Sequence, residues 1–176
     1  ITCRDWSSDV CSSDLGPHSS WGNYAAWGAL DFAPPSEVFG CFSTDIWVVA
    51  VADGVIVRSG HGAVVLDLDG DGREQTGWTV LYMHMESEDR VAVGVHVKAG
   101  DRIGHPSCEG GYPTATHLHL ARRYNGEWIA ADRSLPFNLD GWVSQGNSYE
   151  YNGYLVKDGN TIVAEDGIID ENQIKR

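Results

Sequence analysis

The apolar and polar residues of this chain alternate most clearly around residue 118. Leu118 and Leu120 alternate there with His117 and His119, and Asn125-Gly126 separates this run from a second apolar stretch. Successive side chains of a strand point to opposite faces, and Asn-Gly is a favoured two-residue hairpin turn. The pattern therefore predicts a β-hairpin whose first strand carries both imidazoles on one face.

Similar runs, separated by Gly, Pro, Asn and Asp, predict further short strands. Two pairs are joined at Asp53-Gly54 and Asp158-Gly159-Asn160, and a third flanks an acidic turn at residues 69–72. The expected strands cover residues 46–52, 55–59, 63–68, 78–84, 154–156 and 161–164. Between residues 91 and 104, apolar residues and glycines recur at every third position, which indicates short strands and tight turns. No long stretch has the helical period, so a mainly β fold is expected.

The chain has 176 residues, enough for one domain with a substantial core. The first fifteen residues lack strand or helix periodicity and resemble the translation of a sequencing-adapter oligonucleotide, so residues 1–15 are expected to be non-native. A single domain is expected over residues 16–164, with a frayed tail over 165–176. Of the four cysteines, Cys3 and Cys11 fall in the first segment. Cys41 and Cys108 remain as one candidate disulfide, for which two buried free thiols are an equal alternative.

The composition narrows the classes of partner. The formal net charge is -13 at pH 7, and the sequence pI is about 4.7. Nucleic-acid binding needs clustered Lys and Arg, so no nucleic-acid partner is expected. No apolar run is long enough to cross a bilayer, so no transmembrane segment is expected either.

Two polar residues stand within or at the end of apolar runs, where a buried polar side chain needs a partner. Asp31 interrupts an apolar run before Pro34-Pro35, which suggests a paired or metal-bound carboxylate, although a residue capping the bend is the simpler alternative. His84 ends an apolar strand, a position where functional side chains are common, and a plain edge residue is the alternative. The helical His-Glu-x-x-His zinc motif is absent, so a metallopeptidase here would carry its ligands on strands.

An acidic segment offers a second candidate for a metal site. Asp67, Asp69 and Asp71 alternate as the oxygen donors of a calcium loop do. The second half of that motif fails, because Trp78 stands where a bidentate Glu is required. An acidic hairpin turn is therefore preferred to a bound Ca²⁺ ion.

Six blocks of the sequence together resemble lysostaphin/LytM-type zinc metallopeptidases, over about residues 16 to 130. They are Gly16-Pro17-His18, Ala29–Pro35, Val51–Ile56, Leu81-Tyr82-Met83-His84, Val97–Gly104 and Thr116-His117-Leu118-His119. The resemblance implies an antiparallel β-sheet core of the duplicated hybrid motif type, with long loops walling a groove. It also implies that one Zn²⁺ ion is bound by His18, Asp31 and His119, while His84 and His117 are the catalytic pair.

The chain departs from this family between its first two expected ligands. Twelve residues separate His18 from Asp31, a much longer spacing than usual, so the segment 19–30 is expected to loop out. Its aromatic residues could line a substrate groove, and His61, between two glycines, could lie on the groove wall or in a turn. The expected groove residues are Trp21, Tyr24, Trp27 and His61.

These features together predict a secreted or cell-envelope zinc metalloendopeptidase that hydrolyses the stem or cross-bridge peptides of bacterial peptidoglycan, as a monomer. One alternative is a catalytically inactive relative that binds the cell wall or activates a partner hydrolase. Degenerate relatives lose ligand or catalytic histidines, whereas all five positions are filled here, which favours the enzyme. A weaker alternative is a phosphocarrier with paired histidines, in which Asp31 would have no function.

Overall fold

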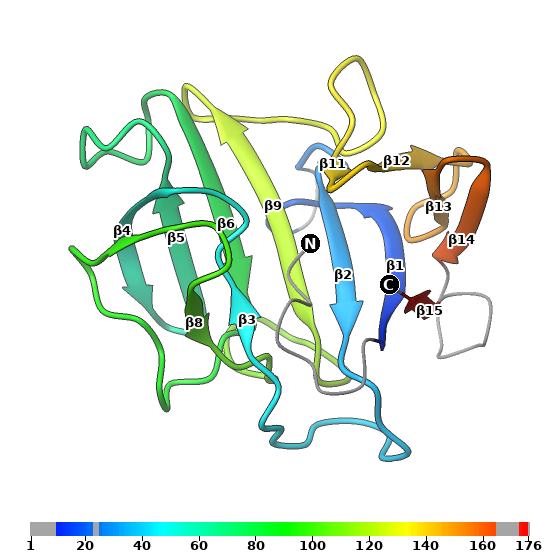
Figure 1. Cartoon of the computed structure of the whole chain (residues 1–176), viewed down its shortest axis with the longest axis horizontal. Coiled ribbons are helices and arrows are strands. Elements are labelled where there is room, and N and C mark those ends of the chain that lie inside the picture. Colours follow the sequence, from blue (N-terminus) through cyan, green and yellow to red (C-terminus); the bar gives the residue numbers. More distant parts are fainter. Residues whose placement is uncertain (1–9, 23–24, 165–172, 176) are drawn as a thin grey trace.

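The computed structural model describes residues 10–22, 25–164 and 173–175, and every regular element among them is a β-strand (Figure 1). The strands form three antiparallel sheets, so the expected mainly β, antiparallel fold is confirmed. No helix that could cross a membrane occurs among these described residues. The strands are β1 Val10–His18, β2 Ala29–Ala33, β3 Val48–Val49, β4 Gly54–Gly60, β5 Ala63–Asp67, β6 Trp78–Met83, β7 His96–Val97, β8 Arg102–Gly104, β9 Leu118–Tyr124, β10 Glu127–Trp128, β11 Asn138–Leu139, β12 Trp142–Gly146, β13 Gly153–Lys157, β14 Asn160–Ala164 and β15 Gln173–Lys175.

The largest sheet has the strand order β15-β1-β2-β9-β6-β5-β4-β7, with β10 paired to β9. A second sheet, β11-β12-β13-β14, lies beside β1, and β3 pairs with β8 in front of the large sheet (Figure 1). The predicted turns at residues 125–126 and 158–159 are confirmed. Asn125 and Asp158 adopt φ of 50° ahead of glycines at φ near 80°, the combination that a type I′ hairpin turn requires.

The predicted hairpin between residues 46–52 and 55–59 is wrong. β3 leaves the large sheet and pairs with β8, while β4 pairs with β5 and β7. The structural reason is burial. Val48 and Ala50 pack into the core, and the buried Tyr82 hydroxyl accepts the Val51 N–H at 2.8 Å, which draws this segment across the sheet.

Both ends of the chain take more part in the fold than expected. β1 begins at Val10, so the boundary expected at residue 16 lies inside a strand that pairs with β2. At the other end, Gln173–Lys175, which lie in the segment expected to be a frayed tail, pair with β1, and Ile174 is 5% exposed. The edge of β1 offers free backbone groups, and pairing with β15 satisfies them.

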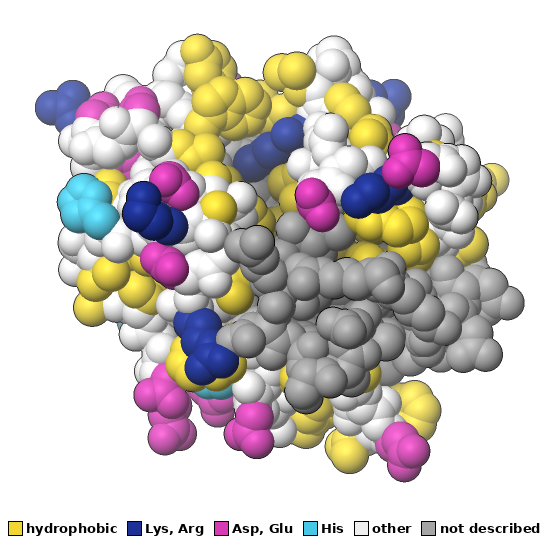
Figure 2. Space-filling model, viewed as in Figure 1, with side chains coloured by type: hydrophobic (Ala, Val, Ile, Leu, Met, Phe, Trp, Pro, Cys, Tyr) yellow, Lys and Arg dark blue, Asp and Glu magenta, His cyan; other side chains and the backbone are white. Residues whose placement is uncertain are grey.

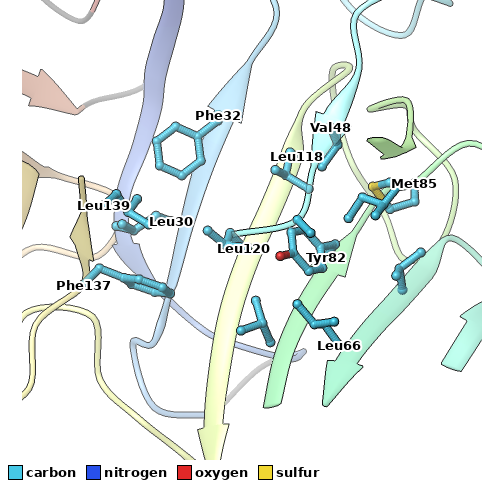
Figure 3. Close-up of a cluster of buried hydrophobic side chains, with 14 of the residues drawn as sticks. Leu30, Phe32, Val48, Leu66, Tyr82, Met85, Leu118, Leu120, Phe137 and Leu139 are labelled. Carbon is cyan, nitrogen blue, oxygen red and sulfur yellow. The ribbon is translucent and has the colours of Figure 1, made fainter. Parts of the chain in front are cut away.

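The two faces of the large sheet carry different side chains. One face packs the main core, in which Leu118 and Leu120 meet Leu66, Tyr82 and other buried residues (Figure 3). The opposite face holds a smaller apolar cluster of Ala29, Ala63, Val65, Leu81 and Ala121. Because side chains alternate along β9, His119 lies on this second face.

The visible surface carries charged side chains of both signs. On the face seen in Figure 2, acidic side chains lie scattered, and the described Lys and Arg side chains are separated by acidic and apolar ones.

Candidate metal centre

Two neighbouring strands bring the first two candidate ligands together. Asp31 of β2 stands directly opposite His119 of β9 in the sheet, and Met83 at the end of β6 lies beside His119 on the other side. Asp31 is 2% exposed, so a buried carboxylate lies in the middle of the sheet. The cost of burying this charge demands cationic or metal partners close by.

His18, at the end of β1, completes a compact triangle of atoms. The His18 Nε2 atom lies 3.2 Å from Asp31 Oδ1, the His119 Nδ1 atom lies 3.1 Å from the same oxygen, and the two nitrogens are 3.1 Å apart. Ligand atoms bound tetrahedrally at about 2.0–2.1 Å from a zinc ion are separated by about 3.3 Å. The three atoms are therefore spaced as zinc ligands are.

Hydrogen bonds set the tautomers of both imidazoles in this triangle. His18 donates from Nδ1 to the Gly16 carbonyl at 2.8 Å, and His119 donates from Nε2 to the Ser20 carbonyl at 3.0 Å. In the neutral form of each ring, the nitrogen without a proton is therefore the one that faces Asp31. Such outer hydrogen bonds are the usual means by which proteins aim imidazole lone pairs at a metal.

Asp31 is the electrostatic centre of the group. Burial is the largest single influence on the pKa of Asp31, and it raises that pKa. The nearby His18 and His117 rings and the contacts from His119 together lower it by more, so the pKa of Asp31 lies well below its ordinary value. Although both nitrogens lie close to Asp31 Oδ1, this buried oxygen receives no well-directed hydrogen bond. A carboxylate oxygen left in this state, between two nitrogen lone pairs, fits a divalent cation.

Two further imidazoles flank the triangle. The rings of His84 and His117 meet edge to face at 4.6 Å, and His117 Nε2 lies 3.3 Å from Asp31 Oδ2. His84 donates from Nδ1 to the Gly110 carbonyl at 2.9 Å, and His117 donates from Nδ1 to the Ala115 carbonyl at 2.9 Å. In the neutral form of each ring, Nε2 is therefore the nitrogen that can accept a proton. Burial, followed by the proximity of His117, lowers the pKa of His84 to about 4, so His84 is neutral near pH 7.

The structure thus brings all five residues expected at the site into one cluster, and a further aromatic residue joins them. Tyr151, which was not singled out from the sequence, stacks on the His18 ring at 5.0 Å. It adopts φ of 72°, an uncommon value for a non-glycine residue, and its backbone exchanges hydrogen bonds with Gly16 and Pro17. Nothing in the local sequence marks this loop, because its role depends on contact with a strand far away in the chain.

The expected groove residues have different positions. Trp21 is 43% exposed and lines a small cavity with Trp128 on the same face of the sheet as His119. Trp27 is partly buried, and its carbonyl accepts the Ala131 N–H. His61 occupies the β4–β5 turn with φ of 52° and is exposed, which agrees with the turn interpretation. Tyr24 lies outside the described residues.

The acidic segment forms the turn that the sequence favours. Oxygen atoms of Asp67, Asp69 and Asp71 lie within 4.8 Å of one another, so the spacing alone would suit a cation. Each carboxylate also accepts a backbone N–H from within the turn, as at 2.8 Å between Gly72 and Asp67. These hydrogen bonds stabilise the turn by themselves, and the less favoured alternative, a bound Ca²⁺ ion, stays untested.

A disulfide joins Cys41 to Cys108 and braces the loop that precedes His117. Thr116 makes hydrogen bonds to Phe42 through its hydroxyl and to Gly40 through its backbone N–H. The segment around residue 41 is thus tied to the 108–116 region both covalently and by hydrogen bonds.

Replacing both cysteines with serine is expected to lower the free energy of unfolding by about 4 kcal/mol, because the disulfide closes a loop between residues 67 positions apart. Denaturant titration of the wild-type and double-variant proteins measures the difference. Wild-type protein kept in reductant is the matched control and should lose the same amount. An unchanged unfolding midpoint in the double variant would contradict this prediction.

Comparison with known proteins identifies the family of this chain. The family model of peptidase family M23 matches residues 39–131, a range that contains His84, His117 and His119 but begins after His18 and Asp31. No curated protein matches the chain. Among solved structures, the M23 metalloprotease pseudoalterin from the deep sea is similar at 25% identity and a TM-score of 0.70, covering 90% of this chain and 92% of that one. The catalytic domain of the antimicrobial peptidase lysostaphin from Staphylococcus simulans is 29% identical, with a TM-score of 0.47, and the match covers 68% of this chain and 86% of that domain.

Proposed function

Because this chain belongs to peptidase family M23, we propose that it is a zinc-dependent endopeptidase that cleaves the peptides of bacterial peptidoglycan. The observation that carries the metal assignment is the convergence of two imidazole lone pairs and one buried carboxylate oxygen at separations of 3.1–3.2 Å. The substrate class rests on the resemblance of the sequence blocks to lysostaphin/LytM-type peptidases.

His18, Asp31 and His119 would hold the zinc ion through Nε2, Oδ1 and Nδ1. A bound zinc ion supplies Lewis-acid polarisation of a carbonyl and lowers the pKa of a coordinated water toward neutrality. Three protein ligands, two nitrogens and one oxygen, are the donor set of catalytic rather than structural zinc sites, which keep one position for solvent or substrate.

The other two histidines move the protons. In the neutral tautomers of His84 and His117, Nε2 is the nitrogen without a proton, because their Nδ1 atoms donate to backbone carbonyls. One ring takes a proton at Nε2 as water attacks the peptide carbonyl, and the leaving amine receives a proton in turn. The ring that is protonated at that moment can also donate a hydrogen bond to the developing oxyanion. The orienting carbonyls of Gly110 and Ala115 keep both rings aimed at the site.

The same proposal covers location and assembly. Substrate in the cell wall requires a protein that is secreted or held in the cell envelope, and a braced loop such as that at Cys41 and Cys108 suits an oxidising compartment. The proposal also takes the peptidase to act as a monomer.

Purified protein is expected to lower the turbidity of a bacterial cell-wall suspension and to release new amino groups from it. A chelator should abolish both effects, and added zinc should restore them, because the site needs its metal to polarise the carbonyl. Metal analysis should find one zinc ion per chain. Tight zinc binding without release of amino groups would favour the inactive, wall-binding alternative, and failure to bind zinc would overturn the proposal.

A further inference from the structure

The long segment between His18 and Asp31 contributes directly to the metal centre. Of the four imidazoles in the cluster, His18 and His117 each donate to a carbonyl two residues earlier in the chain, and His84 donates to the 109–110 loop. His119 instead donates from Nε2 to the carbonyl of Ser20, which lies in this segment. The segment is therefore more than a spacer that loops away from the site.

The Ser20 side chain explains why its carbonyl stays in place. The Ser20 hydroxyl donates to the Ala26 carbonyl at 2.7 Å and accepts the Gly28 N–H at 3.1 Å. The Ser20 N–H donates to the same Ala26 carbonyl at 3.0 Å. Ser20 is wholly buried, so these bonds are shielded from water. One hydroxyl thus ties the beginning of the segment to its end.

Close packing leaves this arrangement little freedom. A Cβ atom on Gly28 would stand 2.5 Å from Ser20 Oγ and 2.5 Å from the Ile129 carbonyl oxygen. At the outer side of the segment, the Ser19 N–H donates to Glu150 Oε1 at 3.1 Å. The Ser20 carbonyl is therefore held from both sides at the distance that His119 needs.

We propose that Ser20 is a positioning residue for the metal site, which holds His119 in the tautomer whose Nδ1 faces the ion. This inference rests on the proposed function. Without the pinned carbonyl, His119 is free to carry its proton on Nδ1, and in that tautomer it cannot bind a metal through Nδ1. Loss of such an outer partner typically weakens metal binding about 10–100-fold.

The test compares the full chain with two serine variants, Ser20→Ala and Ser19→Ala. Ser19 is the matched control, because Ser19→Ala removes a hydroxyl that donates to the Gly22 carbonyl in the same segment and leaves in place the backbone N–H that donates to Glu150. The measurements are the Zn²⁺ dissociation constant, by competition with a chromophoric chelator, and the visible spectrum of the Co²⁺-substituted protein. Far-UV circular dichroism verifies that each variant is folded.

Ser20→Ala is expected to raise the Zn²⁺ dissociation constant about 10–100-fold and to change the Co²⁺ spectrum, while Ser19→Ala leaves both within about twofold of wild type. Equal metal affinity in the two variants would overturn the inference and leave the proposed function intact. If the wild-type chain bound no zinc, the proposed function itself would fail.

A second measurement needs no variant. In zinc-loaded wild-type protein, the Nε2 proton of His119 should exchange slowly with solvent, because it is hydrogen-bonded to a buried carbonyl. Nuclear magnetic resonance of labelled histidine detects this proton. Rapid exchange at His119 would overturn the assignment of Ser20 even if Ser20→Ala failed to fold.

Discussion

Replacing Asp31 with alanine or asparagine is expected to abolish activity and zinc binding together. Asp31 supplies the only carboxylate in the described cluster, and its Oδ1 atom lies 3.1–3.2 Å from both candidate ligand nitrogens. A metal ion contributes several kcal/mol to transition-state stabilisation, so its loss should lower kcat/KM by about 10³-fold or more. Metal analysis of the purified variants and an assay of amino-group release measure the two effects.

Asparagine is the sharper of the two substitutions at Asp31. It keeps the shape of the side chain and removes the negative charge, so a folded Asp31→Asn protein isolates the charge from packing. Asp45→Asn is the matched control, because Asp45 is exposed. An Asp31→Asn protein that retained one zinc ion per chain and wild-type activity would show that the ion is held elsewhere.

Replacing His84 or His117 with alanine is expected to lower kcat by about 10²–10⁴-fold while zinc is retained. Neither ring belongs to the triangle of candidate ligand atoms, but both lie against it, with His84 5.9 Å from the His119 ring centroid. The measurement pairs steady-state kinetics with the zinc content of the same samples. Metal loss and proton transfer are thereby separated in one experiment.

His96→Ala is the control for this pair, since His96 is exposed on β7 and should leave both readouts unchanged. Loss of zinc from His117→Ala would contradict the assignment, because it would make His117 a ligand through the Nε2 atom that now lies 3.3 Å from Asp31 Oδ2. Near-normal rates in both variants would show that the proton is moved by another group.

Features encoded by neighbouring residues were predictable from the sequence. The alternation around Leu118 identifies β9, because a period of two places His119 opposite the core. The Asn125-Gly126 turn follows from the positive φ that its hairpin requires. The candidate ligands could be named because sequence blocks around them resemble a known family, and the register that pairs Asp31 with His119 brings two of them together.

Features that depend on contacts between segments far apart in the chain could not be predicted from the local sequence pattern. β3 resembles the first strand of a hairpin with β4, yet burial of Val48 and the bond to Tyr82 place it against β8. The role of Ser20 is equally hidden, because its carbonyl meets His119 from a position 99 residues earlier in the chain. Tyr151 reaches His18 only after the β12–β13 loop folds over β1.

The contact between the β12–β13 loop and β1 determines how much of the chain a transferred site must include. Gly16 has no room for a side chain, because a Cβ atom would stand 2.6 Å from the backbone of Asn152 and Gly153. The Tyr151 backbone forms hydrogen bonds with Gly16 and Pro17, and the Glu150 carboxylate accepts one from Ser19, so both sides of His18 are held by this loop. A chimera that carries the proposed metal centre would therefore have to include the β12–β13 loop. A graft confined to residues 39–131 would lack this loop and two of the three proposed ligands, His18 and Asp31.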